Sequence, residues 1–232
     1  LMRKFRNEGY NVYIVAPTER REGRKTSVTE EKGVKILSVR TLNVQKTNVI
    51  EKGIGQVSIE FLYKRAIRKH FAGVDFDLIL YSTPPITFSK VIEYAKGENP
   101  NVKTYLLLKD IFPQNAVDMG MLSKTGAKGI LYKFFRAKEK KLYALSDYIG
   151  CMSPANVRYV LEHNIEISDD RVEVAPNSIE LVETEKDVER RVLSKYNIPT
   201  RKPVFIYGGN LGVPQGIQFL IECLAVNADR ED

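Results

Sequence analysis

Short apolar runs alternate along the chain with stretches in which apolar residues recur at helical spacing. The apolar runs predict strands at 11–17, 33–39, 77–83, 102–108, 147–153, 171–177 and 203–209. The intervening stretches predict helices at 1–9, 56–71, 86–96, 126–145, 154–163 and from about residue 215. Strand and helix therefore alternate throughout, which is typical of an α/β fold with a parallel sheet and helices on both of its faces.

The loops that follow the predicted strands are the expected positions of ligand-binding and catalytic residues. In open α/β sheets, ligands bind outside the carboxyl ends of the strands. The loops at those ends are 17–25, 82–86, 109–115, 153–156, 176–180 and 208–216. The most distinctive residues of the chain fall within them.

A glycine-rich loop lies in the segment FIYGGNLGVPQGI, residues 205–217, between a strand and a helix. Its notable residues are Gly208, Gly209, Asn210, Gly212, Pro214, Gln215 and Gly216. Glycines let a phosphate approach the backbone, and the N–H groups at a helix N-terminus stabilise its negative charge. The spacing matches neither the dinucleotide fingerprint GxGxxG nor a P-loop. A tight strand-to-helix turn without a ligand is the alternative interpretation.

Three further loops carry polar side chains. In KDIFPQNAVDMG (109–120), Lys109 and Asp110 follow a buried strand, and a carboxylate there can accept a proton or bind a hydroxyl. Asp110 as a turn cap is the alternative. The segment STPPITF (82–88) offers the Ser82 and Thr83 hydroxyls ahead of two prolines that favour an extended loop. Asn177, in APNSIE, can close an Asx-turn.

Taken in order, these motifs resemble a known family. The segments STPP, LLLKDIFPQNAVDMGML, CMSPANVRYVLEHN, RVEVAPNSIE and KPVFIYGGNLGVPQGI are similar to those of the bacterial family-four glycosyltransferases of the capsular and O-antigen polysaccharide branch. The resemblance covers residues 1 to about 228. Each piece is degenerate, and the ordered set with this spacing is what makes the resemblance specific.

The resemblance implies a GT-B fold, in which two Rossmann-like domains face each other across a cleft. Residues 1–182 would form the N-terminal, acceptor-side domain and 183–232 the beginning of the C-terminal, donor-side domain. Such enzymes move a sugar from a nucleotide-sugar donor to a surface-polysaccharide acceptor, which can be polyprenyl-linked. They generally retain the anomeric configuration and need neither a metal nor another cofactor.

The resemblance also assigns roles to residues. Asp110 and Lys109 would be catalytic. Ser82, Thr83, Pro84 and Gln114 would lie on the acceptor side. The donor diphosphate would be bound by Gly208, Gly209, Asn210, Gly212, Gln215, Gly216 and Asn177.

The sequence departs from the family pattern at several of these positions. Many members carry Arg and Lys where Asn210 and Gln215 stand, and His where Lys109 stands. Neutral side chains and helix N–H groups would then bind the diphosphate, which is a weaker arrangement. The family's first strand would precede Leu1, and its paired glutamates would follow Asp232. We therefore expect this chain to bind acceptor-side ligands better than donors and not to catalyse transfer alone.

Composition narrows the function classes further. The chain has 232 residues, of which 43% are hydrophobic, so it can bury a core. No apolar run is long enough to span a membrane, and residues 1–10 lack the apolar region of a secretory signal. Cys151 and Cys223 lie far apart without nearby histidines, which argues against a disulfide scaffold or zinc site and fits the cytoplasm.

Charge is unevenly distributed along the chain. Residues 1–150 hold 27 Lys and Arg against 15 Asp and Glu, whereas residues 151–232 hold 9 against 14. A basic first part suggests an anionic partner: nucleic acid, a membrane surface or a phosphorylated substrate. Ordinary solvated lysines are the alternative. Nucleic acid is disfavoured because no aromatic and basic stacking platform is visible.

The segment 124–141 concentrates this charge. It contains seven Lys and Arg against the single acid Glu139, with apolar residues interleaved. A basic amphipathic helix can lie on the inner face of an anionic membrane, which suits a lipid-linked acceptor. The alternative is a helix packed on the sheet through Ile130, Phe134 and Leu142, with its other face in water.

Other classes remain open beside the transferase. The missing cations at Asn210 and Gln215 leave room for a non-catalytic GT-B-like scaffold of a polysaccharide assembly complex. A nucleotide-binding oxidoreductase is disfavoured by the absence of GxGxxG within the chain.

Overall fold

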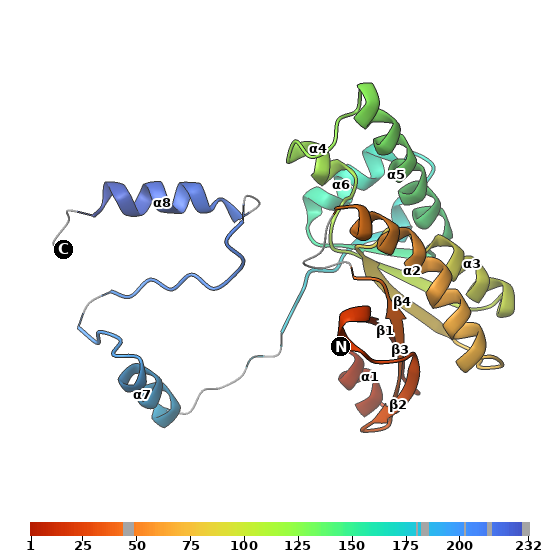
Figure 1. Ribbon diagram of the computed structural model, residues 1–232, viewed down its shortest axis with the longest axis horizontal. Helices are drawn as coiled ribbons and strands as arrows, with labels where there is room; N and C mark the ends of the chain where they lie inside the picture. Colours follow the sequence, from red (N-terminus) through yellow and green to blue (C-terminus); the bar gives the residue numbers. More distant parts are fainter. Residues whose placement is uncertain (44–48, 180, 182–185, 202, 213–214, 229–232) are drawn as a thin grey trace. The chain divides into compact units, whose positions relative to one another are not determined.

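The computed structural model describes residues 1–232 except 44–48, 180, 182–185, 202, 213–214 and 229–232, and omits the side chains of 49–54, 56–57 and 186–190. The chain divides into two compact units, residues 1–176 and 177–232 (Figure 1). The expected domain boundary after residue 182 stays a prediction, because residues 182–185 lie outside the described part.

The first unit contains two sheets and the helices that connect their strands. Its elements are α1 (Met2–Asn7), β1 (Tyr13–Glu19), η1 (Arg20–Glu22), β2 (Ser27–Glu31), β3 (Val34–Thr41), α2 (Val49–His70), β4 (Leu78–Thr83), α3 (Ser89–Glu98), β5 (Lys103–Leu108), α4 (Gln114–Asp118), α5 (Gly126–Leu145), β6 (Tyr148–Cys151), α6 (Pro154–His163), η2 (Asp169–Arg171) and β7 (Val172–Val174). The predicted alternation of strand and helix is thus confirmed from β3 to β7, whereas β1, β2 and β3 follow one another without an α-helix between them.

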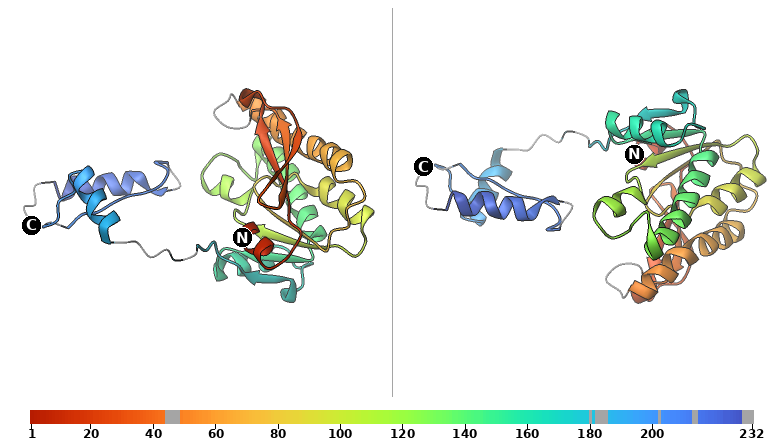
Figure 2. Two further views of the ribbon diagram at one scale, coloured as in Figure 1. Left: turned by 90° about the horizontal axis from the view of Figure 1, so that it is seen from below. Right: turned by 90° about the horizontal axis from the view of Figure 1, so that it is seen from above.

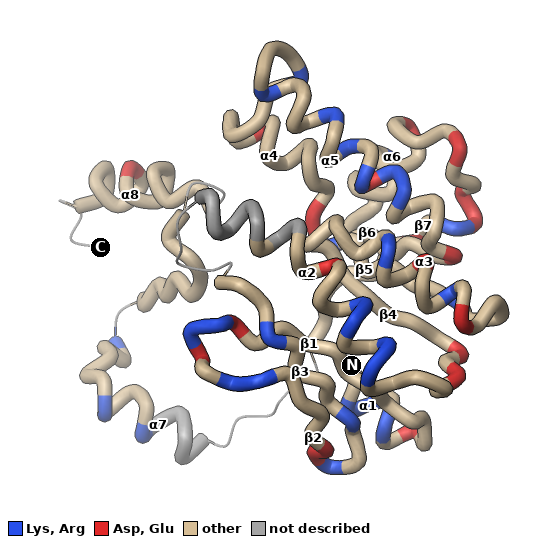
Figure 3. Tube along the Cα trace, turned by 45° about the vertical axis from the view of Figure 1, so that its right-hand side comes forward, with Lys and Arg blue, Asp and Glu red and all other residues tan. Residues whose placement is uncertain are grey.

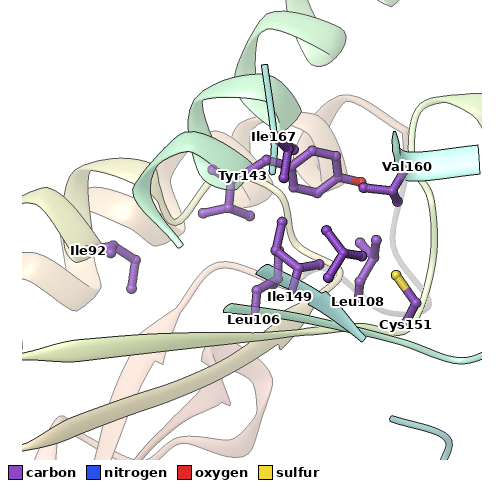
Figure 4. Close-up of a cluster of buried hydrophobic side chains, with 10 residues drawn as sticks. Ile92, Leu106, Leu108, Tyr143, Ile149, Cys151, Val160 and Ile167 are labelled. Carbon is purple, nitrogen blue, oxygen red and sulfur yellow. The ribbon is translucent and has the colours of Figure 1, made fainter. Parts of the chain in front are cut away.

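Strands β4, β5, β6 and β7 form an all-parallel sheet in that order. Helices flank it, as expected for a Rossmann-like α/β fold. A core cluster joins the sheet to α3, α5 and α6 (Figure 4). Leu106 and Ile149 of the sheet and Leu142 of α5 are fully buried there. Tight packing on this face fixes the carboxyl ends of β5 and β6 relative to each other.

A second sheet has the order β1-β3-β2 and is not purely parallel, contrary to the expected single parallel sheet. β1 pairs with β3 in parallel, whereas β2 pairs with β3 antiparallel. Lys32 and Gly33 join β2 to β3 with φ of 50° and 77°. Positive φ at both loop residues is the geometry of a two-residue hairpin turn, which explains the antiparallel strand that the periodicity missed.

Helices α2, α3 and α5 lie next to one another beside the sheets (Figure 2). α2 packs on β3 through a second core cluster that includes Leu37, Ile59 and Tyr63. Val91 of α3 belongs to the same cluster, so α3 links the cores of the two sheets. The first unit is therefore one packed body despite its divided sheet.

The face of the parallel sheet opposite the core cluster is less covered. Strand alternation places Leu78, Tyr105 and Tyr148 on that face, and all three are exposed or half-buried. The expectation of helices on both faces is borne out for the face that carries Leu106 and Ile149.

Gly150 offers a test of packing on the less covered face. A Cβ at this position would crowd the Tyr105 hydroxyl and lie 2.7 Å from Ala175 Cβ, which is fixed to the backbone. The Tyr105 hydroxyl donates a 2.6 Å hydrogen bond to Glu173, and this bond would have to shift. We expect Gly150→Ala to lower the free energy of unfolding in urea by ~1–3 kcal/mol.

Gly97 is the matched control for this substitution. It lies in α3, and a Cβ there meets nothing within 4 Å. Gly97→Ala should be neutral or raise stability by up to ~1 kcal/mol, since alanine favours the helix. Equal stability of the Gly150 and Gly97 variants would contradict the predicted clash.

The second unit contains helices α7 (Lys186–Lys195) and α8 (Ile217–Val226). The helix expected from about residue 215 is confirmed. The strand expected at 203–209 is not: these residues form neither strand nor helix. A strand needs a neighbouring strand to bond with, and the described part of this unit contains none. Phe205 and Ile206 are accordingly exposed.

Candidate functional site

The carboxyl end of β5 opens onto a pocket. Lys109 and Asp110 follow the last strand residue, Leu108, and the chain then turns into the short helix α4. The pocket has a volume of ≈ 370 Å³ and is lined by Lys109, Asp110, Ile111, Gln114, Asn115, Asp118, Ala155, Asn156 and Tyr159. Its walls come from the loop after β5, from α4, and from α6, which follows β6. This is the edge of the sheet at which the strand pattern predicted a ligand.

Three of the residues singled out in the sequence meet in this pocket: Lys109, Asp110 and Gln114. Asp110 and Lys109 are exposed at its mouth, whereas Gln114 is half-buried in its wall. An exposed carboxylate can accept a hydrogen bond from a ligand hydroxyl, and an adjacent ammonium can bind an anionic group.

Two buried acceptors in the α4 wall have no hydrogen-bond partner among the residues that the structure describes. The Gln114 amide nitrogen donates to Asp118 Oδ1 at 2.6 Å. The Gln114 side-chain oxygen and that of Asn115 are both buried without a hydrogen bond to any described residue. A buried acceptor left unpaired costs ~1–3 kcal/mol, so hydroxyl donors from a ligand would stabilise this wall.

The N-terminus of α6 forms the opposite wall. Ser153 caps the helix: its Oγ accepts the Asn156 backbone N–H at 3.2 Å and donates to Asn156 Oδ1 at 2.9 Å. The cap holds the Asn156 amide at the pocket wall. Pro154 occupies the first position of the helix and has no backbone N–H, so the helix N-terminus has one fewer donor that needs a hydrogen-bond partner.

Tyr159 supplies the aromatic part of the wall. Its ring stacks on His163, with centroids 3.9 Å apart, which fixes its orientation. Burial raises the pKa of the Tyr159 hydroxyl, so it stays protonated and able to donate at neutral pH. The pocket thus combines carboxylate, amide, hydroxyl and aromatic groups, a set suited to a polyhydroxylated ligand.

Ser82, Thr83 and Pro84 lie beside this pocket and do not line it. Thr83 is buried, and its hydroxyl donates to the Asp110 backbone carbonyl at 3.3 Å. The β4 end therefore holds the loop that carries Asp110. Ser82 pairs with Leu107 on the less covered face of the sheet, and Pro84 is exposed.

The glycine-rich loop belongs to the second unit. Gly216 has φ of 63° and caps α8, so the last residue of the loop needs glycine. The Tyr207 hydroxyl donates to the Asn210 carbonyl at 2.8 Å, and the Gln215 N–H donates to the Gly212 carbonyl at 3.1 Å. Gly208, Gly209 and Asn210 are exposed, whereas Pro214 lies outside the described residues.

Asn177 is the first residue of the second unit and is exposed. Its assignment to the donor site, like that of the loop, stays a prediction. No group of three His, Cys, Asp or Glu side chains that could hold a metal occurs in the part of the chain that the structure describes.

Four polar residues of the pocket were not singled out from the sequence: Asn115, Asp118, Asn156 and Tyr159. The signal for Asn156 was its place in the loop 153–156, at the carboxyl end of a predicted strand. Tyr159 follows it by three positions on the same helix, and so lies on the same side. Asn115 and Asp118 reach the pocket through the helix α4, which has only five residues and is too short to show a helical periodicity in the sequence.

Comparison with known proteins gives no assignment: no family model matches the chain, and no curated protein matches it.

Proposed function

We propose that the chain is part of a GT-B glycosyltransferase that moves a sugar from a nucleotide-sugar donor to a surface-polysaccharide acceptor. The observation that carries the proposal is the pocket at the ends of β5 and β6. It gathers the exposed carboxylates of Asp110 and Asp118, two amide oxygens without a partner among the described residues, and a protonated tyrosine within one small concavity. These groups hydrogen-bond hydroxyls, and the pocket is polar enough to favour a glycan over an apolar ligand.

Asp110 takes the central role in this proposal. Its carboxylate would orient an acceptor hydroxyl and accept its hydrogen bond, while Gln114 and Asn115 accept bonds from neighbouring hydroxyls. Lys109 would bind a phosphate of the donor or of a polyprenyl-linked acceptor. Transfer would proceed with retention at the anomeric carbon and without a metal, as in the family that the sequence resembles.

The donor would be a nucleotide sugar whose diphosphate lies against the loop 208–216. Two features support this assignment: exposed glycines ahead of a helix, and the N-terminus of α8 itself. Negative charge develops on the leaving diphosphate in the transition state, where helix N–H groups stabilise it.

A non-catalytic scaffold of a polysaccharide assembly complex is the second candidate. It is favoured by the absence of any cationic side chain from the sequence 208–216. A scaffold would still bind glycan in the pocket but would show no affinity for nucleotide sugars. Donor binding therefore separates the two candidates.

We place the protein in the cytoplasm, at the inner face of the membrane, where a lipid-linked acceptor would be presented. None of the described helices is long and apolar enough to cross a membrane.

Binding of acceptor glycans tests the pocket directly. We expect Asp110→Ala to weaken the affinity of the chain for oligosaccharide acceptors, measured by isothermal titration calorimetry, by about 10- to 100-fold, since hydrogen bonds to charged groups contribute ~1.5–3 kcal/mol. Asp75→Ala is the matched control, because Asp75 is exposed and does not line the pocket. Unchanged affinity in the Asp110 variant would refute its role.

A further inference from the structure

A second concavity lies over the N-terminal end of α3, between α2 and α5. It has a volume of ≈ 830 Å³ and is lined by Glu60, Phe61, Lys64, Arg65, Arg68, Thr87, Lys90, Phe134 and Lys138. We call it the basic groove. It contributes nothing to the pocket at Asp110, with which it shares no lining residue.

Three cations of the basic groove are available to a ligand. The side chains of Arg65, Arg68 and Lys90 are exposed, and none makes a hydrogen bond or ion pair with any described residue. Lys64 lies over the Tyr94 ring, 5.3 Å from its centroid, and it forms no ion pair with a carboxylate of the described residues. Figure 3 shows basic positions along α2 and α5.

Glu60 is the one acid among the described residues of the lining, and its charge is already engaged. Its Oε1 accepts the Lys90 backbone N–H at 2.5 Å and the Ser89 hydroxyl at 3.2 Å. Its Oε2 lies 3.7 Å from Lys138 Nζ. Glu60 thus caps the start of α3 and pairs with α5, so the remaining field of the groove is positive.

Apolar side chains stand beside these cations, and they are unusually exposed. Phe61 of α2 is 65% exposed, and Ile130 and Phe134 of α5 are 75% and 46% exposed. Ile130, Phe134 and Lys138 follow each other at intervals of four residues, and so do Phe61 and Arg65. Each helix therefore presents apolar and basic residues together on the side that faces the groove.

This arrangement corrects the expectation for the helix at 124–141. Of the three residues expected to pack it on the sheet, only Leu142 is buried, and Ile130 and Phe134 are left in water. Four of its seven cations are paired: Arg136 with Glu139, Lys138 with Glu60, Lys140 with Glu166 and Lys141 with Glu93. The free positive charge comes mainly from α2 and α3.

From these observations we infer that the basic groove docks on an anionic membrane surface. Arg65, Arg68 and Lys90 bind lipid phosphates, while Phe61, Ile130 and Phe134 enter the interface. A soluble anion would use the cations but would leave the apolar side chains exposed. Nucleic acid bases could stack on Phe61 and Phe134, but a nucleic acid would leave the aliphatic Ile130 and Leu131 of this surface in water. A lipid surface satisfies both kinds of group.

Vesicle flotation tests the inference with the whole chain. We expect binding to phosphatidylglycerol-containing vesicles at low salt and none to pure phosphatidylcholine vesicles. Arg65→Glu/Arg68→Glu should lower the partition coefficient at least about 25-fold, because each basic residue near such a surface contributes roughly fivefold. Phe61→Ser/Ile130→Ser should leave binding at low salt but make it much more sensitive to added salt.

The control is Arg3→Glu/Lys103→Glu, which changes the net charge equally at exposed positions outside the groove. It should bind nearly as well as the unmodified chain. Circular dichroism and urea unfolding confirm that every variant keeps its fold.

Three results would overturn the inference. The first is that the chain does not bind anionic vesicles. The second is that the groove variant and the control variant lose binding equally. The third is that the chain binds inorganic phosphate or an oligonucleotide through Arg65 and Arg68 but does not bind vesicles. The inference rests on the groove's own residues. Because the readout contains no sugar transfer, a failure here is distinguishable from a failure of the proposed function.

Discussion

Arg136→Met is expected to destabilise the first unit by about 3–5 kcal/mol, the cost of leaving a buried charge without its partner. Arg136 donates to Glu139 Oε2 at 2.6 Å, and Glu139 is only 3% exposed. Its second nitrogen donates to the His163 carbonyl at 2.8 Å and to Asn164 Oδ1 at 2.7 Å. The substitution therefore removes the hydrogen bonds that Arg136 donates to α5 and to the C-terminal end of α6. Helix α6 forms one wall of the candidate site.

The loss should depend on pH, with a sign set by Glu139. Burial raises the pKa of this carboxyl, whereas Arg136 and the Tyr143 hydroxyl lower it. A carboxyl with a raised folded-state pKa binds its proton more tightly when folded, so its ionisation reduces stability as pH rises above the unfolded pKa of ~4.3. Removing Arg136 raises the pKa of Glu139 further. The variant should therefore lose more stability at neutral pH than in mild acid.

Urea unfolding at several pH values measures both effects. Arg158→Met serves as the control, because Arg158 is exposed on α6 and should change stability by less than ~0.5 kcal/mol. Adding Glu139→Met to Arg136→Met should recover more than half of the loss by removing the unpaired carboxylate. A pH-independent loss below ~1 kcal/mol would contradict the buried-pair explanation.

The network also shows where sequence reasoning about charge reaches its limit. From the sequence, residues 124–141 are a basic helix with one acid, and this count is correct. The count does not show that Glu139 points into the core. Nor does it show that Lys138 pairs with Glu60 of α2, Lys140 with Glu166 of the loop after α6, and Lys141 with Glu93 of α3. These partners lie far away in sequence, so only tertiary packing brings them together.

Local patterns predicted the first unit well where the elements are long. Continuous apolar runs predicted β4 and β5, and helical spacing predicted α6 at 154–163, which is where the structure has it. The hairpin of β2 was missed because Ser27–Glu31 is entirely exposed and carries no hydrophobic alternation. The feature that marks this hairpin is the turn at Lys32 and Gly33. Such a turn is set by the positive φ angles of its two residues, and a hydrophobic pattern does not reveal it.

The candidate site was predictable in part, for a physical reason. Parallel strands end at one edge, so Lys109, Asp110 and the 153–156 loop had to lie near one another. Thr83 was expected to offer its hydroxyl to a ligand, yet that hydroxyl is bonded to the Asp110 carbonyl. Whether a polar side chain at a strand end faces a ligand or supports a loop depends on the neighbouring strand, which a local motif does not specify.

Gly209→Asp should reduce the affinity of the chain for nucleotide sugars by roughly a hundredfold or more, because opposing like charges at short range costs several kcal/mol. The proposed function places the donor diphosphate against Gly208 and Gly209, and the sequence 208–216 contains no Lys or Arg to compensate an added carboxylate. Binding of a panel of nucleotide sugars, first to the unmodified chain, provides the measurement. Absence of any such binding would refute the role of this loop and favour the scaffold.

A matched pair of substitutions separates charge from crowding at the same loop. A Cβ on Gly209 would lie 3.2 Å from the Tyr207 hydroxyl, which holds the Asn210 carbonyl, whereas a Cβ on Gly208 meets nothing within 4 Å. Gly209→Ala adds the Cβ without the charge, and Gly208→Asp adds the charge without the crowding. If the diphosphate binds here, both aspartate variants lose affinity and Gly209→Ala loses far less. Equal losses in Gly209→Ala and Gly209→Asp, with Gly208→Asp unaffected, would show that the loop needs its shape and does not contact the phosphate.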